Sequence, residues 1–194
     1  MEKPFFFGFP LKQNFVEFVY GNGTILPHEL PMISQLWDVK HAEDAKLTGG
    51  AVDDALRKTT IMGIDNNEAN AWLYNRLAEF ALRCNNEHYY FDLQGFYEPL
   101  QLMRYGSEDH FDWHLDFGPG AISERKLSIT VQLSDEDAYE GGDLEFMVNK
   151  EYVKAPREQG TVIVFPSFIM HRVTPVTKGT RESIVGWIAG PPFR

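Results

Sequence analysis

The segment HFDWHLDFG, residues 110–118, places two histidines and two aspartates at alternate positions. On a β-strand alternate residues share a face, so these four would line one face and the apolar residues between them the other, as core. The polar set is His110, Asp112, His114 and Asp116, and the apolar set is Phe111, Trp113, Leu115 and Phe117. Imidazole with carboxylate is a donor set for non-haem iron(II), although an exposed edge strand with solvated charges would give the same pattern.

A second group of candidate residues lies in the C-terminal segment. An apolar run, residues 161–165, ends at Pro166; His171 follows, and Arg181 opens another predicted strand ten residues later. A 2-His-1-carboxylate site needs two ligands close together and a third from elsewhere in the fold. An oxoacid that chelates such a metal needs a fixed cation for its distal carboxylate, and arginine supplies one as a planar fork. Arg181 has the right type, and Ser183 lies two residues on, on the same face.

The elements that must position these residues change character along the chain. In residues 1–85 the spacing of Leu73, Leu77, Phe80 and Cys84 predicts a helix, with Asp65 or Asn66 as N-cap and a stop at residues 85–86. A second helix is expected over about 27–39. Period-2 runs follow from Tyr89: residues 89–93, 99–105, 110–116, 126–134, 143–148, 161–166 and 183–189.

Many short strands without intervening helices predict a mostly β fold. We expect one domain over residues 1–194. Residues 86–194 would form a double-stranded β-helix (jelly roll, cupin-like) core with the metal site, and residues 1–85 a helical N-terminal support.

Composition narrows the function classes. The chain has 194 residues, a formal charge of −10 and a pI of about 5.0, which disfavours binding to nucleic acid. Cys84 is the only cysteine, so neither an internal disulfide nor a Cys-rich zinc site is expected. The first ten residues lack the pattern of a signal peptide, and no apolar run approaches about 20 residues. A cytoplasmic protein without membrane partners is expected.

The segment 105–187 resembles the prolyl 4-hydroxylase-like iron(II)/2-oxoglutarate dioxygenases, and most closely the bacterial PKHD-type hydroxylases. The similar pieces occur in order: Tyr105–Gly106, HLD (114–116), LSITVQLSDEDAYEGGDLEF (127–146), HRVTPVTKGTR (171–181) and Trp187. In this family the metal-binding His-x-Asp pair follows the Tyr-Gly by nine residues. That spacing indicates His114 and Asp116 rather than His110 and Asp112.

The resemblance implies a set of ligands and cofactors. Iron(II) would be bound by His114, Asp116 and His171, and the cofactor-binding residues would be Arg181 and Tyr105. The co-substrates would be 2-oxoglutarate and O2, with succinate and carbon dioxide as co-products and ascorbate as an optional reductant.

Two departures leave the substrate open. Relatives that act on prolyl residues often carry Tyr where Gln132 stands, which weakens the transfer of prolyl specificity. Asp112 would place a carboxylate near the iron, either to stabilise a cationic substrate or to orient His110 or a backbone group. Hydroxylation of a prolyl or other residue in a peptide or protein is the first expectation. The alternatives are a free amino acid or small metabolite, a nucleic-acid demethylase disfavoured by the charge, and a metal-retaining binding or sensor domain. The oligomeric state is not predicted.

Overall fold

The larger of two antiparallel sheets runs through the centre of the molecule in the computed structural model, which describes residues 16–45, 53 and 55–193. Its eight strands are β1 (Val19–Gly21), β2 (Glu43–Asp44), β4 (Thr60–Ile64), β5 (Gly95–Phe96), β6 (Leu100–Tyr105), β8 (Arg125–Gln132), β12 (Val162–Pro166) and β15 (Arg181–Ala189). They follow the order β1-β12-β8-β15-β6-β4-β2, and β5 pairs with β15.

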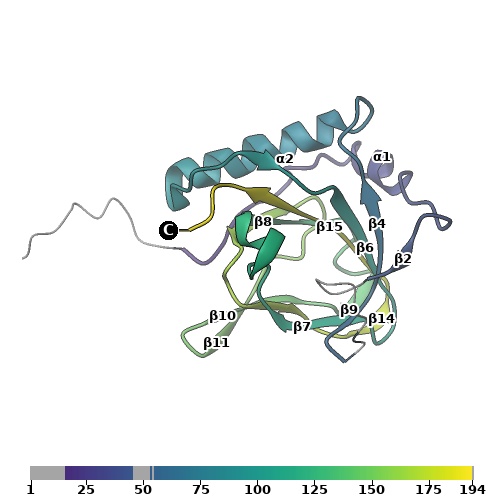
Figure 1. Ribbon diagram of the computed structural model, residues 1–194. Helices are drawn as coiled ribbons and strands as arrows, with labels where there is room; N and C mark the ends of the chain where they lie inside the picture. The colour runs from purple at the N-terminus through teal and green to yellow at the C-terminus, as the bar shows by residue number, and fades with distance from the viewer. Residues whose placement is uncertain (1–15, 46–52, 54, 194) are drawn as a thin grey trace, which may run out of the picture.

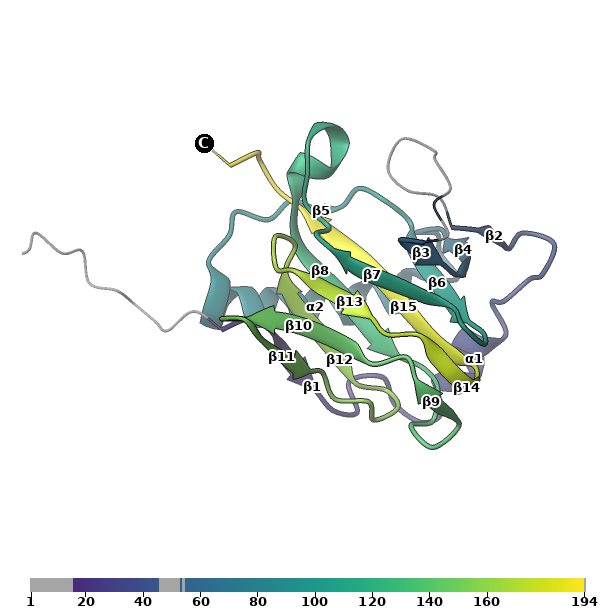
Figure 2. The ribbon, with the colours of Figure 1, turned by 90° about the horizontal axis from the view of Figure 1, so that it is seen from below.

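The smaller sheet faces the larger one and carries much of the predicted site (Figure 2). Its strands are β3 (Arg57–Lys58), β7 (His110–His114), β10 (Leu144–Val148), β11 (Glu151–Lys154) and β13 (His171–Val173), in the order β11-β10-β13-β7-β3. A two-stranded ribbon of β9 (Tyr139–Gly141) and β14 (Val176–Gly179) lies at one end. Two facing antiparallel sheets connected in this way form a double-stranded β-helix, as the sequence predicts.

One long helix, α2 (Ala71–Cys84), lies across the outer face of the larger sheet (Figure 1). Its N-cap is Asn70 rather than residue 65 or 66, and the chain does not stop turning at Asn85. It continues as a π-helical turn, η1 (Asn85–Tyr89), which ends where Tyr90 adopts a left-handed φ of 57°. The strand predicted over residues 89–93 is therefore wrong.

The other helical segments are short. The helix expected over about 27–39 is a single turn, α1 (Leu30–Ser34), with Pro31 in its first turn, where a missing N–H costs nothing. A 3-10 helix, η2 (Gly120–Glu124), follows the metal-site strand. No helix within the described residues is long and apolar enough to cross a membrane.

The N-terminal part also contributes strands. β1, β2 and β4 extend the larger sheet and β3 extends the smaller one. The expectation that this part is a helical support is therefore incomplete, because strands of two to five residues are too short to show a clear period.

Period-2 alternation divides the interior into two cores. On β8, Leu127, Ile129 and Val131 belong to the core beneath α2. The residues between them, Ser128, Thr130 and Gln132, point into the space between the sheets, where the polar face predicted from the sequence lies. Apolar residues from both sheets, such as Met103, Phe146 and Phe165, pack a second core around that space.

Candidate active site

A cavity of about 540 Å³ opens between the two sheets. Its wall includes side chains from β6, β8, β12 and β15 of the larger sheet and from β3, β7, β10 and β13 of the smaller one. A cavity of this size holds a whole small-molecule ligand. A five-carbon diacid fills only part of it, which leaves room for a second substrate.

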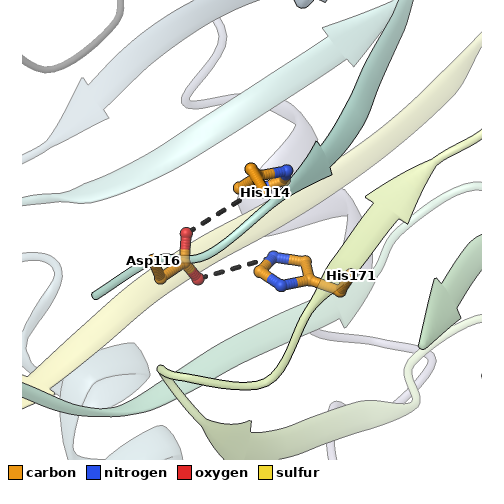
Figure 3. A group of neighbouring side chains, drawn as sticks. All are labelled: His114, Asp116 and His171. Atoms are coloured by element: carbon orange, nitrogen blue, oxygen red, sulfur yellow. Dashed lines mark ion pairs between the residues drawn. The ribbon is translucent and has the colours of Figure 1, made fainter. Parts of the chain in front are cut away.

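Three side chains that combine two imidazoles with a carboxylate meet in this cavity: His114, Asp116 and His171 (Figure 3). One donor atom from each lies within 4.8 Å of the other two. The Nε2 atom of His114 lies 3.7 Å from Oδ1 of Asp116, and the Nε2 atom of His171 lies 3.6 Å from Oδ2. His114 ends β7 and His171 begins β13, and these two residues are paired directly across the antiparallel ladder.

A β-bulge in β7 decides which of its side chains reach the cavity. His171 pairs with His114 and Val173 with Phe111, so two residues of β7, Asp112 and Trp113, oppose the single Arg172 of β13. Phe111 and His114 therefore both face the cavity and stack, with ring centroids 3.4 Å apart. The expectation that polar and apolar residues separate onto two faces is wrong here, and Leu115, expected in the core, is 41% exposed at the cavity mouth.

The rival pair lies outside the cavity. The Nδ1 atom of His110 lies 3.0 Å from the carbonyl oxygen of Glu108, and its Nε2 atom lies 3.2 Å from that of Ala55. Asp112 is exposed, and its carboxylate accepts a hydrogen bond from the backbone N–H of Trp113. Neither residue lines the cavity. The expectation of a carboxylate from Asp112 close to the metal is wrong, because the bulge turns that side chain away.

Backbone contacts orient the two imidazoles. The Nδ1 atom of His114 lies 2.7 Å from the carbonyl oxygen of Asp112, and that of His171 lies 2.9 Å from the carbonyl oxygen of Ile169. A carbonyl only accepts, so both Nδ1 atoms carry the proton and both Nε2 atoms present a lone pair to the centre of the cluster. The Ser128 hydroxyl donates to Oδ2 of Asp116 at 2.6 Å and fixes the carboxylate.

The protonation states suit a divalent metal. Burial, together with the nearby His171, lowers the pKa of His114 well below its usual value. Burial alone would raise the pKa of Asp116, but the two imidazoles and the hydrogen bond from Ser128 outweigh it and lower that pKa. At neutral pH the site offers a neutral imidazole at His114 beside a carboxylate. This donor set fits iron(II), which binds deprotonated nitrogen and oxygen ligands.

A buried arginine lies in the wall of the larger sheet. Arg181 is 1% exposed and donates to Ser183 Oγ at 3.1 Å and to Gln132 Oε1 at 2.9 Å. Among the described residues its Nε has no hydrogen-bond partner, and no carboxylate forms an ion pair with it. Tyr105, also 1% exposed, pairs with Arg181 across the sheet, and its ring lies 5.3 Å from the guanidinium carbon. A buried cation of this kind fits the distal carboxylate of an oxoacid.

The cavity also contains charged residues that sequence reasoning missed. Arg125 makes a two-pronged ion pair with Glu98 at the mouth and stacks on Trp187 at 3.7 Å. Arg57, on β3, lines the cavity and is 9% exposed. Isolated charged residues in short strands carry no periodic signal, so the sequence did not indicate either cation.

Comparisons with known proteins agree with this geometry. Residues 100–189 match the model of the 2OG-Fe(II) oxygenase superfamily. A PKHD-type hydroxylase from Synechococcus sp. (strain CC9605) is 32% identical over 169 residues, which cover 85% of this chain and 75% of that protein.

Two solved structures share the fold. One is a Pseudomonas putida prolyl-4-hydroxylase, with a TM-score of 0.72 and 19% identity over 90% of this chain and 93% of that chain. The other is a prolyl hydroxylase from Trichoplax adhaerens in complex with a peptide fragment of the hypoxia inducible factor oxygen degradation domain. Its TM-score is 0.72, with 18% identity over 89% of this chain and 83% of that chain. This chain therefore belongs to the 2OG-Fe(II) oxygenase superfamily, in its PKHD-type branch, and is an iron(II)- and 2-oxoglutarate-dependent dioxygenase.

Proposed function

We propose that His114, Asp116 and His171 hold the iron(II) of this enzyme and that Arg181, assisted by Ser183, holds the distal carboxylate of 2-oxoglutarate. The observation that carries this assignment is the buried guanidinium of Arg181, which has no carboxylate partner among the described residues and lies in the same cavity as a three-donor cluster. Removing a charge from water costs several kcal/mol unless a counter-charge is supplied, so Arg181 favours an anionic ligand.

Each part of the cavity then has a separate task. When bound, the iron with O2 and 2-oxoglutarate supplies oxygen transfer to an unactivated C–H bond, with release of succinate and carbon dioxide. Gln132 orients the fork of Arg181, while its own amide donates to the carbonyl oxygen of Pro156 at 2.9 Å. Tyr105 closes the cavity beside Arg181, and apolar residues such as Leu144 and Val173 exclude water from its interior.

For the substrate, we propose a residue within a peptide or protein, with proline first. The PKHD-type relatives support a hydroxylase, and the Trichoplax neighbour binds a peptide. The mouth also suits an uncharged chain. Leu56, Leu115 and Ile122 are apolar, and Glu98 neutralises Arg125.

A free amino acid or another small carboxylate is the second candidate. It is favoured by the cation of Arg57, which lines the cavity and forms no ion pair within the part of the chain that the structure describes.

We further propose that residues 1–194 form a single dioxygenase domain. A chain with a single cysteine suits a reducing compartment, and we place the enzyme in the cytoplasm.

Replacing Arg181 tests the oxoacid assignment. In Arg181→Met the distal carboxylate loses its cation, and we expect affinity for 2-oxoglutarate to fall by roughly 30- to several-thousand-fold, equivalent to about 2–5 kcal/mol. Iron binding should be unchanged. Succinate release at graded 2-oxoglutarate and metal analysis would measure the two effects.

Arg104→Met is the matched control, because Arg104 stacks on Trp37 and pairs with Glu182 outside the cavity. An unchanged 2-oxoglutarate dependence in Arg181→Met would contradict the assignment.

Three substrate pools test the second part of the proposal. Iron-loaded enzyme would be incubated with 2-oxoglutarate and with proline- and lysine-containing peptides, free amino acids, or methylated oligonucleotides. We expect mass spectrometry to detect a gain of one oxygen in the peptide pool. Turnover confined to either of the other pools would reject the peptide substrate and leave the iron chemistry intact.

A further inference from the structure

Arg57 is a second buried cation in the cavity, and it belongs to the smaller sheet. β3 pairs with β7, so that Arg57 lies directly beside Phe111. The side chain is 9% exposed and lines the cavity. Among the described residues no carboxylate forms an ion pair with it, and its Nε is a buried donor without a hydrogen-bond partner. Its guanidinium lies over an aromatic ring.

That ring places Arg57 relative to the metal ligands. The guanidinium carbon lies 4.6 Å from the centroid of Phe111, and Phe111 in turn stacks on His114 at 3.4 Å and 8°. Arg57, Phe111 and His114 thus form three layers that end at the metal cluster. Arg181 reaches the cavity from the larger sheet instead. Both cations act on Tyr105: burial raises the pKa of its phenol, and the positive charges of Arg181 and Arg57 oppose that rise.

When iron(II) and 2-oxoglutarate occupy the cavity as proposed above, the positive charge of Arg57 has no counter-charge among the groups assigned there. The charges of iron(II) and Arg181 balance those of Asp116 and the oxoacid dianion. Glu98 and Arg125 balance each other at the mouth. An arginine does not lose its proton in a protein, so Arg57 adds a positive charge that none of these groups neutralises. A buried cation without a partner is costly, and an oxygen acceptor from the ligand would offset that cost.

We propose that Arg57 binds a carboxylate or carbonyl oxygen of the primary substrate and so holds the target carbon on the Phe111 side of the metal cluster. Arginine offers two parallel N–H donors, which match a carboxylate or a peptide carbonyl better than a point charge does. The acceptor comes from one of two sources: the free carboxylate of an amino acid, or the backbone carbonyl beside the target residue in a peptide.

Binding without turnover tests this role. Enzyme loaded with iron(II) and 2-oxoglutarate would be kept free of oxygen and exposed to three matched pools. The first contains free amino acids, the second their N-acetyl amides, and the third the corresponding amines, which lack both kinds of acceptor. Saturation-transfer NMR would identify the members that bind, and calorimetric titration would measure their affinity.

We expect wild-type enzyme to bind members of the first or the second pool and none of the third. A preference for the first identifies a carboxylate as the acceptor, and a preference for the second identifies a peptide carbonyl. Arg57→Met keeps an unbranched stem against Phe111 but loses the fork, so the same compounds should bind at least about 30-fold more weakly. Affinity for iron and for 2-oxoglutarate should stay within about threefold of wild type, and Arg104→Met should bind every probe normally.

Several outcomes would overturn the inference. If Arg57→Met binds the probes with wild-type affinity, Arg57 does not contact the substrate. The same conclusion follows if wild-type enzyme binds the amines as tightly as the oxygen-bearing compounds. A wild-type enzyme that binds members of neither oxygen-bearing pool rejects the proposed acceptor chemistry. If Arg57→Met loses iron in parallel with the probes, Arg57 acts through the Phe111 stack and not on the substrate.

Failure of the proposed function would be seen separately. Wild-type enzyme with iron, O2 and 2-oxoglutarate should form succinate slowly without any substrate, and the control Arg104→Met, altered outside the cavity, should do the same. Absence of succinate from both proteins would reject the assigned chemistry, whatever the binding results.

Discussion

The imidazole of each predicted iron ligand is oriented by the backbone two residues before it. Asp112 supplies its carbonyl oxygen to His114, and Ile169 supplies its carbonyl oxygen to His171. A local contact of this kind uses the backbone and needs no dedicated side chain. The carboxylate of Asp116 does need one, and Ser128 provides it from the facing sheet. The cluster is thus held in place before any metal binds.

The three ligands should therefore be individually essential. We expect His114→Ala, Asp116→Ala and His171→Ala each to abolish stoichiometric iron binding and turnover, because two donors cannot replace the facial set of three. His110→Ala is the matched control. Among the described residues that imidazole contacts carbonyl oxygens outside the cavity and no metal ligand, so iron binding should be retained. Metal content after gel filtration measures both effects, and iron loss confined to His110→Ala would show that the metal lies at the other pair.

For individual residues, the sequence predicted which side chains belong to the site better than it predicted where each side chain points. Spacing from Tyr105 indicated His114 and Asp116, and the structure brings both into one cluster with His171. The direction of Asp112 was predicted wrongly, because one extra residue in β7 reverses the face of every side chain beyond it. The bulge arises from the pairing of β7 with β13, and the sequence of β7 alone does not show how the two strands pair.

Among the elements, the turn between β9 and β10 determines how much room Arg181 has. Gly142 has a left-handed φ of +60°, and its N–H donates to the carbonyl oxygen of Pro175 at 3.1 Å. A Cβ added there would lie 3.0 Å from both Cδ of Arg181 and Cγ2 of Val176. Both the backbone conformation and the close approach favour glycine.

Gly142→Ala should therefore weaken 2-oxoglutarate binding through Arg181. We expect an affinity loss on the order of tenfold, about 1.4 kcal/mol, since crowding a packed site typically costs about 1–3 kcal/mol. Gly23→Ala is the control, because Gly23 has a φ of +63° and nothing within 4 Å of the added Cβ. It should lose stability for the same backbone reason, about 1–2 kcal/mol, and keep its 2-oxoglutarate affinity. Equal 2-oxoglutarate affinity in the two variants would show that Gly142 does not affect 2-oxoglutarate binding through Arg181.

Long strands were predictable from period 2 and short ones were not. The run predicted over residues 126–134 is β8, Arg125–Gln132, and the run over 183–189 is β15, Arg181–Ala189. The strands β1–β4 have two to five residues each and gave no signal. They form because their neighbours in the sheets pair with them, a long-range effect that local pattern does not report.

Across the whole molecule, the α2 core and the cavity lie on opposite faces of the larger sheet. Leu102 and Ile184 face α2, while the residues beside them, Met103 and Ser183, face the cavity. The α2 core is apolar and includes Cys84, which is 2% exposed. Stability can therefore be changed separately from catalysis at positions such as Cys84, which belongs to the α2 core and does not line the cavity.

Cys84 offers a test of this separation through pH. Burial raises the pKa of its thiol to about 11, from an ordinary value near 9. Below pH 9 the thiol is protonated in both folded and unfolded chains, so its contribution to stability is fully present. Between pH 9 and 11 only the unfolded chain ionises, and stability should fall by about 2–3 kcal/mol.

The comparison is between wild type and Cys84→Ala in urea unfolding at pH 8, 9, 10 and 10.5. The variant loses buried apolar volume and should be less stable by about 1–2 kcal/mol at pH 8. Its decline above pH 9 should be shallower than that of wild type, although not absent, because burial also raises the pKa of Tyr89 in the same core. Parallel declines would show that Cys84 ionises as readily in the folded protein as in the unfolded one. Affinity for 2-oxoglutarate at pH 8 should be equal in the two proteins, because Cys84 lies on the far side of the sheet from Arg181.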